Sequence, residues 1–203
     1  VGSSLRNLLL VKKLERQEAS LRTFFSPVVL KAISVLDSEA VLQPRECDLS
    51  VLFCDLRGFS KTSEELSDDL LELLARVSEA LGITTSNILD FGGVIGDFHG
   101  DSVMGFWGWP IPPTGSEQNA VSAVKAALAI HQHVDHHARL GEVDRCGRDD
   151  RGFQFGIGIA SGESVAGKIG TRDQVKVTAF GPVVNLASRL EGLTKWLNSK
   201  ILI

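Results

Sequence analysis

The spacing of the hydrophobic residues changes along the chain. Near the N-terminus, apolar side chains recur every seven positions at Leu14, Leu21 and Val28, and this spacing predicts a helix. With so few repeats, the pattern is equally compatible with a short coiled coil and with an amphipathic helix that lies on a folded domain. We therefore expect residues 1–36 to form a helical linker, with both arrangements open.

After residue 36 the pattern alternates between strands and helices. Strands are expected at 49–55, 91–98, 102–107 and 153–160, helices at 64–81, 120–137 and 183–195, and a hairpin at 162–180. Residues 37–48 are polar and predict a connector, and Gly82 predicts the end of the first of these helices. The order strand–helix–strand–strand–helix–strand is typical of a ferredoxin-like βαββαβ sandwich of the α+β class, which we expect over residues 37–203.

Composition and charge narrow the class of protein. The chain has 203 residues and 43% hydrophobic content, which suits one domain with a core. Its net charge of -4 disfavours a protein that coats nucleic acid. Residues 1–36 carry six basic and two acidic side chains (+4), so the remainder carries -8. Three cysteines, with Cys54 inside an apolar run, favour a reducing, cytoplasmic setting.

The two ends of the chain suggest a piece of a longer protein. It begins without methionine and stops on the apolar run Ile201-Leu202-Ile203. A longer protein could be attached to a membrane elsewhere, although no run in this chain approaches the ~20 apolar residues of a membrane span.

Two aspartates lie where predicted strands end. Asp55 closes an apolar strand, and Asp101 follows Gly100 in the turn between two strands. A carboxylate at the end of a buried strand is costly unless it is paired or binds a cation. Two of them on neighbouring strands suit Mg²⁺, which also takes phosphate oxygens as ligands. At this point the alternative is equally open: Asp55 caps the next helix and Asp101 only forms a turn.

A second polar pair lies one helical turn apart at Asn185 and Arg189, on a helix that follows Gly181-Pro182. Arginine presents a planar fork of donors that suits phosphate. A surface Asn/Arg pair alone is usually just solvated, but together with the two aspartates it indicates phosphate chemistry.

Three motifs occur in order along the chain. They are Phe53-Cys54-Asp55-Leu56-Arg57-Gly58-Phe59-Ser60, Gly100-Asp101-Ser102-Val103-Met104 and Gly181-Pro182-Val183-Val184-Asn185-Leu186-Ala187-Ser188-Arg189-Leu190-Glu191. They resemble the F-x-D-[IL]-x-G-F-[ST], G-D-x-x-M and G-[DN]-x-V-N-x-A-[AS]-R-L-E signatures of bacterial class III nucleotidyl cyclases. Several motifs in order are far more specific than any one of them. Pro182 departs from the usual Asp or Asn, and proline is benign at a first helical position.

The resemblance implies conversion of a nucleoside triphosphate to its 3′,5′-cyclic monophosphate and pyrophosphate, with two Mg²⁺ or Mn²⁺ ions per site. Asp55, Asp101 and Leu56 would hold the metals. The phosphates would be bound by Leu56, Arg57, Gly58, Phe59 and Ser60. Asn185 would orient the ribose, and Arg189 would stabilise charge on the α-phosphoryl group.

The resemblance also implies a homodimer. In this family the site forms between two head-to-tail catalytic domains, with the aspartates from one and Asn185 and Arg189 from the other. Because one chain carries both halves of the site, the homodimer is expected to have two equivalent sites. An upstream sensor would act through residues 1–36 in signal transduction. The family's last strands, with a lysine that contacts the triphosphate, would lie beyond Ile203 and are expected to be missing here.

Base recognition departs from the family pattern. Adenylyl cyclases usually carry Lys four residues before the second metal aspartate and guanylyl cyclases carry Glu; here it is Asp97, and Thr178 is the second base-reading residue. With guanine, Asp97 would accept from N1–H and N2–H₂ while Thr178 donates to O6. With adenine, Asp97 would accept from N6–H₂ while Thr178 donates to N1. We expect ATP slightly more than GTP.

Two further interpretations stay open. The chain could be a cyclase-like domain that binds nucleotide or dimerises without turnover. Separately, histidines on the helix predicted at 120–137 could share a metal, although no acidic or cysteine partner is adjacent. These are His131, His133, His136 and His137.

Overall fold

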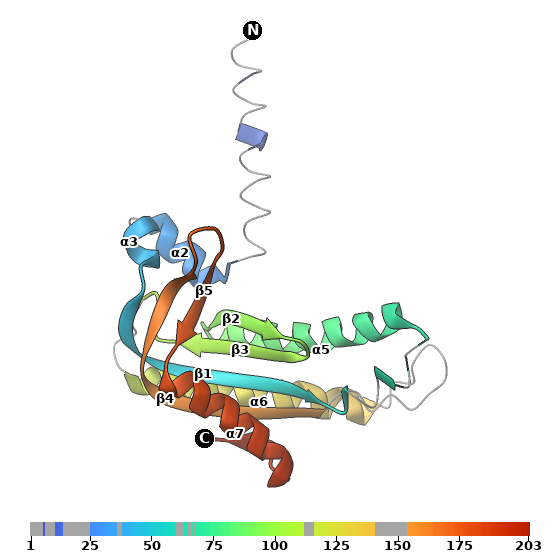
Figure 1. Cartoon of the computed structure of the whole chain (residues 1–203). Coiled ribbons are helices and arrows are strands. Elements are labelled where there is room, and N and C mark those ends of the chain that lie inside the picture. The colour runs from blue at the N-terminus through green and yellow to red at the C-terminus, as the bar shows by residue number, and fades with distance from the viewer. Residues whose placement is uncertain are drawn as a thin grey trace.

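The part of the chain that the structure describes folds into an α+β domain (Figure 1). The computed structural model describes residues 6, 11–13, 25–35, 38–59, 63–64, 66, 68–111, 116–140 and 154–203. Its elements are α2 (Pro27–Val35), α3 (Ser38–Leu42), β1 (Arg45–Arg57), α5 (Leu70–Asp90), β2 (Val94–His99), β3 (Ser102–Trp107), α6 (Ser116–Leu140), β4 (Gln154–Gly170), β5 (Val175–Phe180), α7 (Pro182–Trp196) and β6 (Ile201–Leu202). Leu14 and Leu21, which carry the predicted linker helix, lie outside the described residues.

One sheet organises the domain. Its strand order is β2-β3-β1-β4-β5, and β6 pairs with β4 in parallel. β1 is antiparallel to β3 on one side and to β4 on the other, so it lies at the centre. The chain order β1-α5-β2-β3-α6-β4 confirms the predicted ferredoxin-like α+β sandwich.

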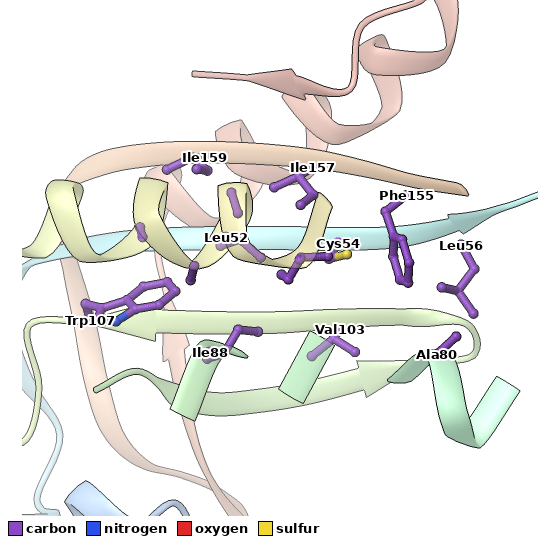
Figure 2. Packing of buried hydrophobic residues seen from close by; sticks show 14 residues of the cluster. Leu52, Cys54, Leu56, Ala80, Ile88, Val103, Trp107, Phe155, Ile157 and Ile159 are labelled. Atoms are coloured by element: carbon purple, nitrogen blue, oxygen red, sulfur yellow. The ribbon is translucent and has the colours of Figure 1, made fainter. Parts of the chain in front are cut away.

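Helices cover both faces of the sheet, and the alternation of β1 side chains divides the core accordingly. Leu52, Cys54 and Leu56 belong to the cluster that packs against α5 and α6, where Figure 2 shows them opposite the side chains of the helices. Val51 and Phe53 belong to the second cluster, which includes buried residues of α2 and α7. Because β1 is buried on both faces, its sequence is a nearly continuous apolar run.

α7 lies unusually close to β4. A Cβ atom on Gly158 would be 2.2 Å from both the Ala187 carbonyl oxygen and the Glu191 nitrogen. Only a residue without a side chain fits beneath the helix backbone at that distance. The glycine therefore sets the depth at which α7 packs, and with it the direction of the polar residues that the helix carries.

Two predicted boundaries are wrong for identifiable reasons. The predicted connector at 37–48 contains α3 and the start of β1, where polar residues 45–48 pair with β4 beyond the edge of the core. The helix predicted at 64–81 is α5, which begins after the N-cap Asp69 and runs through Gly82 to Asp90. It continues because Thr84 and other side chains after the glycine are buried, so tertiary packing outweighs the low helix propensity of glycine.

The strand predicted to stop at residue 160 is also longer. β4 runs without a break from Gln154 to Gly170; it pairs with β1 as far as Ala166, and residues 165–170 form the hairpin with β5. Gly162 and Gly167 both have a φ of +153°, a backbone conformation that residues with a side chain rarely adopt.

We predict opposite effects for two glycine-to-alanine changes. Gly82→Ala should raise the free energy of unfolding by about 0.5–1 kcal/mol, because the position is inside a helix and a Cβ there meets nothing within 4 Å. Gly158→Ala should lower it by roughly 1–3 kcal/mol or more, because α7 must move away from β4. Urea unfolding followed by circular dichroism measures both. A destabilised Gly82→Ala would show that the helix ends at that glycine.

Candidate functional site

The two aspartates lie side by side at the end of the central strands. In the β1–β3 ladder Asp55 is opposite Ser102, the residue that follows Asp101. The pKa of the Asp55 carboxyl is raised to about 6, mainly by its half-burial and also by the negative charge of Asp101, while Arg57 and Lys195 oppose the shift. Two carboxylates that repel each other here form an anionic site that a cation would stabilise.

A third carboxylate, which the sequence reasoning missed, comes from α7. Burial raises the pKa of Glu191 to about 7, and the charges of Asp55 and, more weakly, Asp101 act in the same direction. The space for it comes from Gly156, which is opposite Asp55 in the β1–β4 ladder. A Cβ on Gly156 would lie 3.1 Å from a Glu191 carboxylate oxygen. Glycine at alternate strand positions, 156 and 158, was the available signal for a close helix.

The donor set suits a hard divalent cation with partial protein ligation. Among the described residues, no group of three or more His, Cys, Asp or Glu side chains is arranged as a complete metal cage. Mg²⁺ does not need one, since it is usually held by one or two carboxylates plus water and phosphate oxygens. Asp55 and Asp101 fit that requirement.

The segment after Asp55 is shaped by Gly58, whose φ of +88° is in the region that favours glycine. Phe59 packs at the edge of the core. Arg57 points instead toward α7: its Nη2 donates to the Ser199 carbonyl oxygen at 2.5 Å. In this structure its guanidinium therefore lies against the end of α7. Ser60 is outside the described residues.

Asn185 and Arg189 lie on the face of α7 opposite to the one that packs on the sheet. Val183 and Ala187 are buried against the second core cluster, whereas Asn185 and Arg189 are exposed. The structure therefore does not bring these two residues to Asp55 within one chain. The same exposed side of α7 carries Leu193, 46% exposed, and Trp196, 86% exposed. An apolar exposed surface around polar residues is typical of a protein–protein contact.

The two expected base-reading residues lie on different strands, Asp97 on β2 and Thr178 on β5. Asp97 already has a partner that the sequence reasoning missed: Lys176 Nζ donates to both of its carboxylate oxygens, each at 2.9 Å. Partial burial alone would raise the pKa of Asp97, but the hydrogen bonds from Lys176 and the Phe98 amide and the lysine's charge lower it overall.

A cavity of about 670 Å³ lies beside this ion pair. Its walls come from β2, the start of β5, α5 and the chain around Ser26. The Ser26 hydroxyl accepts a hydrogen bond from the Ile95 amide at 2.9 Å, which ties the segment before α2 to the edge strand β2. In the second half of the predicted linker, Val29 and Ala32 are buried, and Val29 belongs to the second core cluster and lines this cavity.

The histidines do not form one site in the described residues. His131 is buried with its Nε2 3.3 Å from the Lys200 carbonyl oxygen, and His133 Nδ1 is 3.4 Å from the Asn87 amide. These contacts join α6 to two different elements. The side chains of His136 and His137 are outside the described residues. Among the described helices, none is long and apolar enough to cross a membrane.

Comparison with known proteins identifies the family to which this fold and these motifs belong. The sequence model of the "Adenylate and Guanylate cyclase catalytic domain" matches residues 41–202. The chain belongs to this family of class III adenylate and guanylate cyclases. It is 34% identical over 161 residues to the "Adenylate cyclase, terminal-differentiation specific" of Dictyostelium discoideum, covering 76% of this chain but only 7% of that protein. It is 30% identical over 155 residues to "Adenylate cyclase 1" of Rhizobium meliloti, covering 76% of this chain and 22% of the relative.

Similar solved structures have the same fold, and they include an adenylyl cyclase and a guanylyl cyclase. The adenylyl cyclase CyaB from P. aeruginosa superposes with a TM-score of 0.66 at 32% identity, covering 74% of each chain. The guanylyl cyclase Cya2 superposes with a TM-score of 0.56 at 30% identity, covering 74% of this chain and 71% of that one. The family is therefore established, while the choice of base is not decided by these similarities.

We predict a pH-dependent effect of Asp55→Asn on stability. A carboxyl whose pKa rises on folding, here from 3.8 to about 6, stabilises the fold below pH 4 and loses that contribution as pH rises through 6. With divalent cations removed by EDTA, the variant should be more stable than the original chain at pH 7, by on the order of 1 kcal/mol after solvent screening. At pH 4 the two should be nearly equal.

Urea unfolding at pH 4, 5, 6 and 7 measures this difference, and Glu79→Gln on the exposed face of α5 is the matched control. An Asp55→Asn difference that stays the same across this pH range would contradict the proposed repulsion at the site.

Proposed function

We propose that the chain converts a nucleoside triphosphate to its 3′,5′-cyclic monophosphate and pyrophosphate at sites shared by two copies in a head-to-tail homodimer. The observation that carries the proposal is the separation within one chain. Asp55 and Asp101 lie together at the strand ends, while Asn185 and Arg189 face away from them on α7. A second copy that presents its α7 to the aspartates would complete the site, and symmetry would make two such sites.

The roles of the residues follow from their chemistry. Asp55 and Asp101, with the Leu56 carbonyl, would hold two Mg²⁺ or Mn²⁺ ions, which when bound lower the pKa of the ribose 3′-hydroxyl and neutralise the triphosphate. The amides of residues 56–60 would bind the β- and γ-phosphates, since Gly58 keeps that backbone free of a Cβ.

The other subunit would supply the remaining groups. Asn185 would fix the ribose so that the 3′-oxygen lies in line with the bond from the α-phosphorus to the leaving oxygen. Arg189 would donate hydrogen bonds to the α-phosphoryl oxygens, whose charge changes most in the transition state. Both side chains are exposed on α7, which leaves them free to reach a neighbouring copy.

We propose ATP as the substrate, with GTP as the alternative, and a cytoplasmic output domain whose upstream sensor acts through the segment before α2. The contact between Ser26 and the edge strand β2 supports a mechanical connection of that segment to the domain. A domain that binds nucleotide or dimerises without turnover is the remaining alternative.

Mixing two inactive variants tests the shared site. Asp55→Asn and Arg189→Ala should each reduce the formation of cyclic nucleotide by about 10²-fold or more. An equal mixture after subunit exchange should recover about a quarter of the original activity, since half of the dimers are mixed and each mixed dimer keeps one intact site. Cyclic nucleotide is measured by chromatography with Mg²⁺ and with Mn²⁺.

The matched control mixes Asp55→Asn with Asp101→Asn, because both changes lie on the same half of the site and no intact site can form. No recovery in the first mixture would place the four residues in a site within one chain or outside any site, whereas recovery in the control would show that Asp55 and Asp101 come from different subunits. Absence of cyclic nucleotide from the original chain with either triphosphate would count against the enzymatic proposal itself.

A further inference from the structure

The charge at the base-recognition position differs from what the sequence alone suggested. The family pattern places lysine or glutamate where this chain has Asp97, so the sequence indicated an unpaired acidic acceptor. In the structure this carboxylate is bonded through both oxygens to Lys176 Nζ, and one oxygen also accepts from the Phe98 amide at 2.9 Å. The position therefore holds an ion pair with a cation from β5.

The local backbone explains why these two side chains meet. The β2–β3 ladder has an irregularity between Ile95 and Asp97, and after it Asp97 is opposite Met104. A bulge of this kind re-aims the next side chain. Met104 belongs to the second core cluster, on the face where β5 and α7 lie. Asp97 therefore points toward β5, which contacts β2.

Lys176 is well placed to act together with Thr178. The two residues are separated by one position on β5, so their side chains leave the same face of the strand. The pair with Asp97 lies on the wall of the 670 Å³ cavity, and the lysine side chain is still 56% exposed. An ammonium group has three donors, of which the carboxylate uses two. One donor remains for a ligand.

We propose that Lys176 is a specificity-determining residue that recognises the nucleotide base together with Asp97, and that the pair selects adenine over guanine. This inference rests on the cyclase function proposed above. The ammonium donates to adenine N1, and the remaining lone pairs of Asp97 accept from N6–H₂. The lysine that adenylyl cyclases usually carry on β2 is thus replaced by one on β5.

The ion pair weakens the contact with guanine that a free carboxylate would make. Guanine presents two neighbouring donors, N1–H and N2–H₂, which a free carboxylate binds through both oxygens at once. Here both oxygens of Asp97 are already engaged by Lys176. Adenine, with its N6–H₂ donor beside the N1 acceptor, needs only one lone pair of Asp97 and one donor of Lys176.

Lys176→Met tests the assignment by freeing the carboxylate while keeping a side chain of similar length. We expect the ratio of kcat/KM for ATP to that for GTP to fall by about tenfold or more, the discrimination that one two-bond base contact supplies. The charge-exchanged double variant Asp97→Lys with Lys176→Asp should restore the ratio to within about threefold of the original. Lys168→Met is the matched control, because Lys168 is opposite Val177 and leaves the other face of the β4–β5 ladder.

The same variants are titrated with ATP and with GTP by calorimetry in the presence of Mn²⁺, so that failure of the inference is distinguished from failure of the proposed function. If no cyclic nucleotide forms but the binding preference still depends on Lys176, the cyclase proposal fails and the base assignment stands. An unchanged base ratio in Lys176→Met, an equal loss with both nucleotides, or no binding of either nucleotide overturns the assignment.

Discussion

The close approach of α7 to β4 is the constraint on which the rest of the site depends. Because Gly158 has no side chain, the helix backbone lies directly on the strand. That contact fixes the rotation of α7 about its axis. Ala187 is then buried, Glu191 is directed toward Asp55, and Asn185 and Arg189 are directed to solvent. A helix held further from the sheet could turn, and its polar residues could reach the aspartates of the same chain. The packing removes that option, so the proposed division of the site between two copies depends on one missing side chain.

The same packing gathers negative charge where the strands end. Burial, reinforced by the negative charge of neighbouring carboxylates, raises the pKa values of Asp55 and Glu191 well above their ordinary range. The domain tolerates this repulsion because the core on either side of β1 is large and continuous. Such a site is poised to bind a divalent cation, since binding removes the repulsion as well as forming new bonds. Arg57 lies nearby and lowers both pKa values, although its strongest described contact is to the end of α7.

The local pattern of hydrophobic and polar residues was sufficient to predict much of this fold. The bounds of β3 were predicted to the residue, and the turn that follows β2 placed Asp101 beside Asp55 as expected. The errors arose where packing outweighs local preference. α5 continues through Gly82 because its later turns are buried, and β4 continues past residue 160 because it stays paired with β1 as far as Ala166 and with β5 from Val165 to Gly170. Glu191 was missed because its burial depends on glycines in a strand 33 and 35 residues earlier, and spacing along the chain does not reveal that contact.

Asp97 shows why a substituted motif position should be judged with its spatial neighbours. In sequence, an acidic residue in place of lysine indicated a change of substrate or a loss of function. In the fold, the strand that carries Thr178 also brings Lys176 to that carboxylate, and the two charges share one location whichever strand carries each. Recognition of a base depends on the donors and acceptors present at that location, because a ligand interacts with groups in space. Exchange of the two charges between neighbouring strands can therefore leave the chemistry of a site intact while removing the residue by which the motif is recognised.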